Sequence, residues 1–206
     1  MWVMFLDILF GYKDMKIINA CIPLIKTNQY KGILCSTYRT FPLTAAKTLA
    51  IHTNLPFVVD LRDIIEQYAS NEYISHKFHT FSWLDAFITK RFRKRLLRKR
   101  NNALEVADCV TTVSPWHVEV LKQYNPNVKL IYNDYNCYQN PENIIHLVDY
   151  INSDGKVCDG IGMQSHLDIT DSFHSATNYA KALEYFRLNC PDLEIQITEL
   201  DATMVS

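Results

Sequence analysis

Short apolar runs alternate along the chain with longer segments whose apolar side chains recur at helical spacing. The apolar runs predict buried strands at residues 32–35, 57–60, 109–113, 128–132, 157–162 and 193–198. The helical spacing predicts helices at residues 15–30, 41–52, 80–106, 116–123, 142–153 and 175–189. Because helical segments separate successive strands, the pattern predicts an α/β fold of parallel βα repeats with right-handed crossovers.

Composition narrows the classes of function. The chain has 206 residues, of which 48% are hydrophobic, so it can build one sizeable domain or two small or incomplete ones. A formal net charge of -1 indicates no overall attraction to nucleic acid or to an anionic membrane. No apolar run is long enough to predict a transmembrane helix.

The cysteines and the N-terminus bear on the compartment. No two of the six cysteines form a C-x-x-C pair, so we expect neither a zinc site nor a disulfide framework, and a reducing compartment is favoured. The N-terminal stretch MWVMFLDILFGYKDMK is interrupted by Asp7, and no basic region precedes its apolar residues. We therefore expect no signal peptide, which favours the cytoplasm.

A dense basic block lies within the predicted helix 80–106. Its members are Lys90, Arg91, Arg93, Lys94, Arg95, Arg98, Lys99 and Arg100. One interpretation is a surface for phosphate groups or anionic lipid headgroups. The other is a solvated helix face whose buried side consists of Phe92, Leu96 and Leu97. Aromatic residues do not interleave as stacking platforms would, so nucleic acid is not expected.

The most suggestive stretch for chemistry is EIQITELD, residues 194–201. Its apolar and polar residues alternate as in a strand, and we expect Glu199 where that strand runs out into a loop. A carboxylate at the C-terminal end of a parallel strand, with Asp201 beside it, is a candidate nucleophile or general base. The alternative is a strand that ends in a solvated acidic turn.

Polar residues gather at the ends of three successive predicted strands. They are Asn133, Asp134, Tyr135 and Asn136; then Gln164, Ser165 and His166; then Glu199 and Asp201. Since parallel strands present their carboxyl ends at one edge, this is the layout of a (β/α)-barrel active-site face.

The first part of the chain carries one family resemblance. The segments LCSTYRTFPLTAAKTLA, LPFVVDLRD, EVADCVTTVSPWHVEVLKQY and VKLIYN span roughly residues 12–133. In this order they resemble the acceptor-side N-terminal domain of family 4 retaining glycosyltransferases of the GT-B fold. That resemblance implies a Rossmann-like sheet and an acceptor-binding lobe. The family's glycine-rich loop is not visible, and its donor-binding lobe does not follow.

The last part carries a more specific resemblance. The segments YNDYN, DGIGMQSHLD and QITELD resemble the fifth, sixth and seventh βα units of glycoside hydrolase family 10, whose members are endo-1,4-β-xylanases built as TIM barrels. By this resemblance Glu199 matches the catalytic nucleophile, His166 the histidine that hydrogen-bonds it, and Asp201 the acid that orients that histidine. Asn133, Tyr135 and Gln164 match residues near the sugar subsite beside the cleaved bond.

The resemblance implies retaining hydrolysis of a xylan-type β-1,4 polysaccharide, with no cofactor and no metal. A retaining glycosidase needs a second carboxylic acid about 5–5.5 Å from its nucleophile to protonate the leaving oxygen. The family carries that acid in a W-D-V-V-N-E-type motif, which this chain lacks. We therefore expect little or no turnover.

The two resemblances meet inside residues 130–133, which fit both patterns. The sequence thus predicts a chimeric chain, with a partial Rossmann-like sheet (the GT-B N-lobe) over residues 1–132 joined to a partial TIM-barrel (β/α) fragment over residues 133–206. Three functions stay open: a xylanase-type protein, a glycosyltransferase acceptor lobe, and a non-catalytic product.

Overall fold

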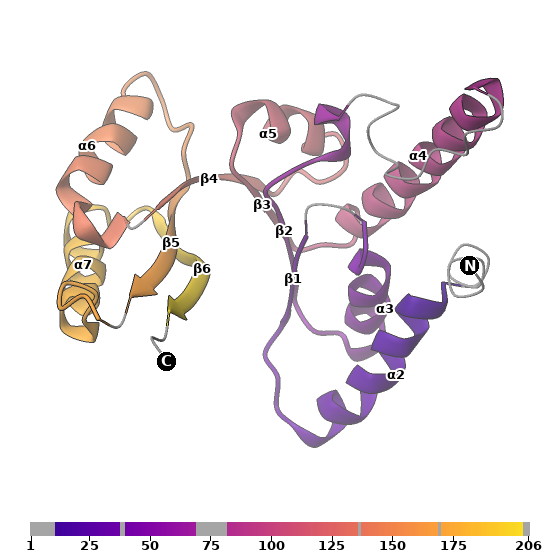
Figure 1. Cartoon of the computed structure of the whole chain (residues 1–206), viewed down its shortest axis with the longest axis horizontal. Helices are drawn as coiled ribbons and strands as arrows, with labels where there is room; N and C mark the ends of the chain where they lie inside the picture. The colour runs from indigo at the N-terminus through magenta and orange to yellow at the C-terminus, as the bar shows by residue number, and fades with distance from the viewer. Residues whose placement is uncertain (1–10, 38–39, 69–81, 136, 169, 204–206) are drawn as a thin grey trace. The chain divides into compact units, whose positions relative to one another are not determined.

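The computed structural model describes residues 11–37, 40–68, 82–135, 137–168 and 170–203 (Figure 1). The chain forms two compact units. The first comprises Met1–Thr112 and Trp116–Val128, and the second Val113–Pro115 and Lys129–Ser206. Predictions made for residues 1–10, for residues 80–81 and for Asn136 lie outside the described residues.

The first unit contains three short strands and their helices. In chain order these are α2 (Tyr12–Thr27), β1 (Ile33–Ser36), α3 (Leu43–Thr53), β2 (Phe57–Leu61), η1 (Ile65–Gln67), α4 (Ser82–Leu104), β3 (Cys109–Thr112) and α5 (Pro115–Leu121). The strands pair in parallel in the order β1-β2-β3. Their inward side chains, among them Phe57, Val59 and Val110, pack with Leu43 of α3 and Leu104 of α4.

Asp60 links the three strands of the first unit. It stands opposite Ser36 of β1 and Thr111 of β3 in the strand register. Both hydroxyls donate to its carboxylate at 2.8 Å, and Nε of Arg62 lies 3.6 Å from Oδ2. A charge that is partly removed from water costs free energy unless it is paired and hydrogen-bonded, and these contacts offset that cost for half-buried Asp60.

The second unit contains three longer strands. Its elements are β4 (Val128–Tyr135), η2 (Cys137–Gln139), α6 (Pro141–Ile151), β5 (Gly160–Asp168), α7 (Ala176–Asn189) and β6 (Glu194–Thr203). The strands pair in parallel in the order β4-β5-β6. Helix α6 begins with Pro141 in its first turn, and α7 is capped by Ser175, whose Oγ accepts from the Asn178 amide.

One face of the second sheet is covered by helices. In Figure 1, α6 and α7 lie on the same side of β5 and β6. Ile161 and Met163 of β5 are buried there against Val148 of α6 and Phe186 of α7. Because side chains alternate along a strand, the intervening residues of β5 face away from the helices.

The prediction of an α/β fold with parallel βα repeats is confirmed. Three predicted strand ends were wrong. β4 continues to Tyr135, β5 to Asp168 and β6 to Thr203, so the polar residues expected in loops lie within strands. The physical reason is that strand pairing uses backbone groups, which continue to bond where one face becomes polar.

The start of β5 also differs from the prediction. The strand was expected from residue 157 but begins at Gly160. Oδ1 of Asn152 accepts from the backbone amides of Val157 and Cys158 and holds them in a turn. Such side-chain bonds compete with strand pairing.

Within the parts of the chain that the structure describes, no helix is long and apolar enough to cross a membrane. The same residues contain no cluster of His, Cys, Asp and Glu side chains suited to a metal ion.

Candidate active site

The face of the second sheet that points away from its helices is lined by polar side chains. On β5 this face carries Gly160, Gly162, Gln164 and His166, since Ile161, Met163 and Ser165 point to the core. The face contains all six residues predicted as a site, and we call it the polar face of β4–β6. Asn133, Tyr135, Gln164, His166, Glu199 and Asp201 thus come from three adjacent strands.

A bulge in β6 decides which side chains reach this face. Met163 pairs with Ile197, but the next residue of β5, Gln164, pairs with Glu199, so Thr198 is an extra residue. An extra residue shifts the alternation by one position. Glu199 and Asp201 therefore face the same side as Gln164 and His166.

Glu199 contacts two side chains of β5. Its Oε1 accepts from Nε2 of Gln164 at 3.1 Å, and its Oε2 lies 3.1 Å from Nε2 of His166. The other ring nitrogen of His166, Nδ1, lies 2.8 Å from Oδ2 of Asp201. Glu199, His166 and Asp201 therefore form one continuous line of polar contacts.

His166 stands between two carboxylates, those of Glu199 and Asp201. Both nitrogens of His166 face carboxylates, and ionised carboxylates only accept hydrogen bonds. The Nδ1 side of the ring is hydrogen-bonded to Asp201, and Nε2 stands at ion-pair distance from Glu199. The side chains of His166 and Glu199 are each 31% exposed, so solvent reaches the pair but screens it incompletely.

Tyr135 and Asn133 complete the polar face from β4. The Tyr135 ring lies 5.1 Å from the His166 ring between centroids and is 67% exposed. An exposed aromatic ring beside polar groups offers an apolar surface to a ligand as well as a hydroxyl. Oδ1 of Asn133 accepts a short hydrogen bond from Oγ1 of Thr198.

Thr198 and Gly162 are parts of the site that the sequence reasoning missed. The Thr198 side chain reaches Asn133 by crossing over Gly162 on the strand between them. A Cβ at Gly162 would lie 2.8 Å from both Oδ1 of Asn133 and Cγ2 of Thr198, so only glycine leaves room for this contact. The available signal was a phase break, because the apolar positions run 195, 197 and then 200.

Asp134 is the acidic neighbour of these residues that does not join them. Its Oδ2 accepts from the Tyr132 hydroxyl at 2.6 Å. Burial, and then this hydrogen bond, raise the pKa of Tyr132. Burial, with Asp134 nearby, raises the pKa of the Cys137 thiol to about 11. These groups stay in their neutral forms near pH 7 and stabilise the strand end.

The basic block lies elsewhere, on α4 of the first unit. The structure divides its eight cations into two sets. Arg93 donates to the Tyr68 carbonyl, Lys99 pairs with Asp14, and Arg100 pairs with Glu66. Lys90, Arg91, Lys94 and Arg98 are exposed, and Arg95 is half-buried.

Comparison with known proteins shows which family this part of the chain resembles. Residues 114–206 match the model of Glycosyl hydrolase family 10. The predicted resemblance of the C-terminal part to family 10 is therefore confirmed. The matched segment begins before the junction predicted at residues 130–133, and it includes α5 and all strands of the polar face.

Curated proteins similar to this segment include endo-1,4-beta-xylanases. The chain is 49% identical over 87 residues to endo-1,4-beta-xylanase A of Butyrivibrio fibrisolvens, covering 41% of this chain and 20% of that protein. It is 32% identical over 113 residues to endo-1,4-beta-xylanase A of Caldicellulosiruptor saccharolyticus, covering 54% of this chain and 31% of that protein. The chain thus spans less than a third of either relative's length.

The solved structures that align with the chain include xylanases. A GH10 endoxylanase retrieved from a sugarcane soil metagenome aligns with a TM-score of 0.49 at 17% identity, over 96% of this chain and 65% of that one. An endo-1,4-beta-xylanase from Caldicellulosiruptor owensensis aligns with a TM-score of 0.47 at 21% identity, over 84% and 64%.

Proposed function

We propose that the polar face of β4–β6 is the nucleophile half of a retaining endo-1,4-β-xylanase site. In this proposal Glu199 attacks the anomeric carbon of a xylan-type chain. His166 and Asp201 position Glu199 and support its charge, and Asn133, Tyr135 and Gln164 contact the sugar beside the cleaved bond. The observation that carries the proposal is the line of contacts from Glu199 through His166 to Asp201.

The chemistry of a retaining glycosidase supports these roles. The nucleophile must be ionised and held still, because it forms a covalent bond to the sugar. Gln164 and His166 each contact a different oxygen of Glu199 and so hold the carboxylate in one orientation. Because Glu199 stands on a paired strand, the strand register sets the direction in which its carboxylate points.

The absent leaving-group acid sets the expected rate. The sequence has no match to the family's acid/base motif, and general acid catalysis typically contributes about 10²–10⁴-fold. An ordinary xylan or an aryl xyloside with a poor leaving group should therefore show little turnover. A substrate whose leaving group needs no proton should still react with Glu199.

The test is covalent trapping with 2,4-dinitrophenyl 2-deoxy-2-fluoro-β-xylobioside. The dinitrophenolate leaves without protonation, and the fluorine slows hydrolysis of the product. Intact-mass spectrometry should show one added fluoroxylobiosyl group, and peptide mapping should place it on Glu199. Glu199→Gln should abolish the adduct. Glu194→Gln is the matched control, because Glu194 stands on the same strand in a pair with Lys129.

Two results would contradict the proposal. One is labelling that persists in Glu199→Gln or maps to another residue. The other is fast release from an unactivated aryl-β-xyloside that Glu199→Ala abolishes, since that result would require a complete acid–nucleophile pair in this chain.

For residues 1–132 we propose the glycosyltransferase-like origin and acceptor-side role predicted from their motifs. The supporting observation is the polar row of Ser36, Asp60 and Thr111 at the carboxyl ends of β1–β3, where ligands bind in open α/β sheets. Genomic sequencing across the codons of residues 130–133 tests the chimera. A continuous family 10 reading frame upstream of that junction in the genome would contradict it.

A further inference from the structure

Helix α4 has two faces with different environments. Positions 93, 96, 100 and 103 face the first unit: Arg93 donates to the Tyr68 carbonyl, the Leu96 carbonyl accepts from Thr40, and Arg100 and Ala103 are buried. At 100° per residue these positions share one side of the helix. This inner face carries Arg93 and Arg100, two of the three cations that have partners within the fold.

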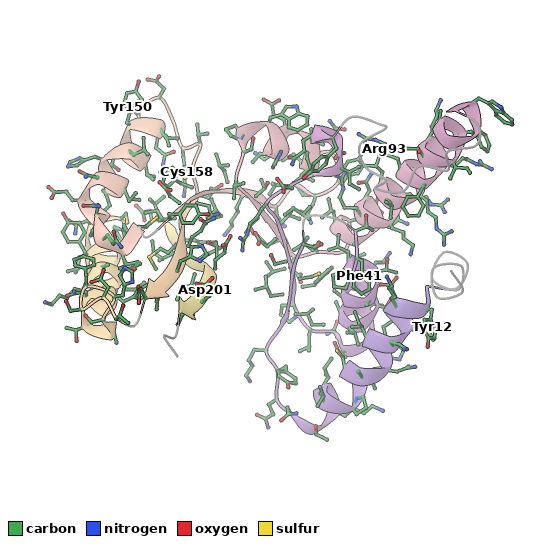
Figure 2. The ribbon with its side chains drawn as sticks, in the orientation of Figure 1. Tyr12, Phe41, Arg93, Tyr150, Cys158 and Asp201 are labelled. Carbon is green, nitrogen blue, oxygen red and sulfur yellow. The ribbon has the colours of Figure 1, made fainter. Side chains whose placement is uncertain are left out.

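The opposite side of α4 carries a second row of residues. Trp83, Phe87, Lys90, Arg91, Lys94 and Arg98 follow one another at helical spacing, and all six are exposed. We call this row the outer face of α4. It extends for about 22 Å along the helix, at 1.5 Å per residue. In Figure 1 the N-terminal half of α4 reaches beyond the strands of its unit, and Figure 2 labels Arg93 on this helix.

The outer face combines aromatic and cationic side chains in separate zones. Trp83 is 69% exposed and Phe87 is 57% exposed, both at the N-terminal end of the row. The guanidinium of Arg91 lies 5.7 Å from the centre of the Phe87 ring and joins the two zones. Phe87, Arg91 and Arg98 also line an open hollow of about 670 Å³ along the helix.

The positive charge of this face is not matched within the unit. Among the described residues, no carboxylate lies within ion-pair distance of Lys90, Arg91, Lys94 or Arg98. Four adjacent cations repel one another at a cost to the fold. That arrangement fits a surface that meets negative charge from outside.

We propose that the outer face of α4 docks the protein onto an anionic phospholipid surface. Lys90, Arg91, Lys94 and Arg98 contact the headgroup phosphates, and Trp83 and Phe87 enter the interfacial layer. Clustered Lys and Arg side chains are attracted to anionic lipids, and Trp and Phe side chains beside them can bury in the boundary between headgroups and acyl chains. The proposal concerns the first unit and is independent of the xylanase-type site.

A lipid surface fits this face better than a nucleic acid strand. Single-stranded nucleic acid is bound by aromatic platforms interleaved with cations, so that successive bases stack. Here both aromatics precede the cations along the helix, and none stands between Arg91 and Arg98 on the exposed row. A planar anionic surface needs only a straight row of charge and a few apolar side chains.

The test is co-sedimentation of the full chain with vesicles. We expect binding to phosphatidylcholine vesicles that contain phosphatidylglycerol, no binding to phosphatidylcholine alone, and release by salt. Each basic side chain near an anionic membrane strengthens binding about fivefold, so replacing Lys90, Arg91, Lys94 and Arg98 by Gln should weaken it on the order of several hundredfold.

Matched control variants distinguish binding by the outer face of α4 from an effect of net charge alone. Replacing Lys26, Lys31, Lys122 and Lys181 by Gln removes the same charge from exposed positions outside the row, and it should leave most of the binding intact. Phe87→Ser should weaken binding to anionic vesicles, whereas Ile51→Ser, at an equally exposed apolar position on α3, should not.

Three outcomes would overturn the proposal. The first is equal loss in the two quadruple variants, which would show a net-charge effect. The second is unchanged vesicle binding after the α4 substitutions. The third is tighter binding of the wild type to single-stranded RNA than to anionic vesicles in the same buffer, lost in the α4 variant, which would assign the face to nucleic acid.

Discussion

His166 and Asp201 are register partners on neighbouring parallel strands, and Nδ1 of the histidine lies 2.8 Å from Oδ2 of the aspartate. This pairing exists because Thr198 adds one residue to β6 before it. If the pairing continued from Ile197 without a bulge, Leu200 would stand opposite His166, and the imidazole would lack a partner on β6. The bulge thus joins the histidine to both acids of the ITELD motif.

Removing the charge of Asp201 should slow the attack by Glu199. In Asp201→Asn the His166 ring loses its charge-assisted hydrogen bond and with it part of its fixed orientation. We expect the fluoroxylobiosyl adduct to form about tenfold more slowly, since such a bond contributes about 1.5–3 kcal/mol when shielded and less when exposed. A mass-spectrometric time course measures the rate. Asp192→Asn, before β6, is the control, and equal rates in all three proteins would contradict the prediction.

A side chain at Gly162 should destabilise the second unit. In Gly162→Ala the added Cβ meets Asn133 and Thr198 at 2.8 Å, so strands must shift. We expect a loss of about 1–3 kcal/mol in the free energy of unfolding, measured by urea denaturation. Adding Thr198→Ser removes one of the clashing methyl groups and should restore part of the loss. An unchanged midpoint in Gly162→Ala would refute the close packing of this face.

Arg100 should contribute to stability rather than to any surface function. It is 1% exposed and donates through two nitrogens to Glu66. Arg100→Ala leaves the Glu66 carboxylate without its partner and should cost about 3 kcal/mol of unfolding free energy. Arg98→Ala, two residues away on the exposed face, should change it by less than about 0.5 kcal/mol. Equal effects would contradict the division of the basic block.

The same pair predicts an acid dependence. Burial by itself raises the pKa of Glu66. The hydrogen bonds and the charge of Arg100 lower it by more, so the net pKa lies below the ordinary 4.5. A lowered carboxyl pKa stabilises the fold above the ordinary pKa, and that stability is lost as the pH falls through the folded value. The difference between wild type and Arg100→Ala should therefore narrow below about pH 4.5. A constant difference would contradict the pairing.

His117 should make stability depend on pH in a higher range. The ring is buried between Thr112 and Gln67, at 3.0 Å from each, and burial lowers its pKa below 6.5 despite nearby Asp63 and Glu66. The unfolded chain then binds a proton that the folded chain does not, so the free energy of unfolding falls as the pH drops below about 6.5.

His117→Gln should remove this slope, measured by urea denaturation across that range. His52→Gln is the control, because His52 is exposed at the end of α3 and should leave the slope in place. A slope that survives in His117→Gln would assign it to another group.

Much of the secondary structure could be predicted because burial leaves a direct mark on sequence. Runs such as 57–60 and 109–113 could be recognised because they contribute buried apolar side chains to the core of the first unit, and the intervening helices show an apolar side. The ends of β4, β5 and β6 could not be predicted in the same way. They are paired strands with one solvated face, and polar residues there resemble a loop.

The motifs indicated the site residues and their mutual contacts, but not the strand geometry that brings them together. The ITELD and MQSH motifs indicated Glu199, His166 and Asp201, whereas the bulge at Thr198 and the open space at Gly162 emerged only in the paired strands. The change in spacing of the apolar residues between 197 and 200 was visible in the sequence. It indicates a bulge only when the pairing of β6 with β5 is known.

By itself the sequence determined that the chain forms parallel βα repeats and that its last third resembles family 10. The tertiary structure alone decided that a bulge at Thr198 turns Glu199 and Asp201 toward His166, and that Arg100 is internal while Arg98 is exposed. The reason is that burial and the side of a helix on which a residue lies determine residue type over short stretches of sequence. Strand register and the choice of ion-pair partners depend on hydrogen bonds and packing between segments far apart in the chain.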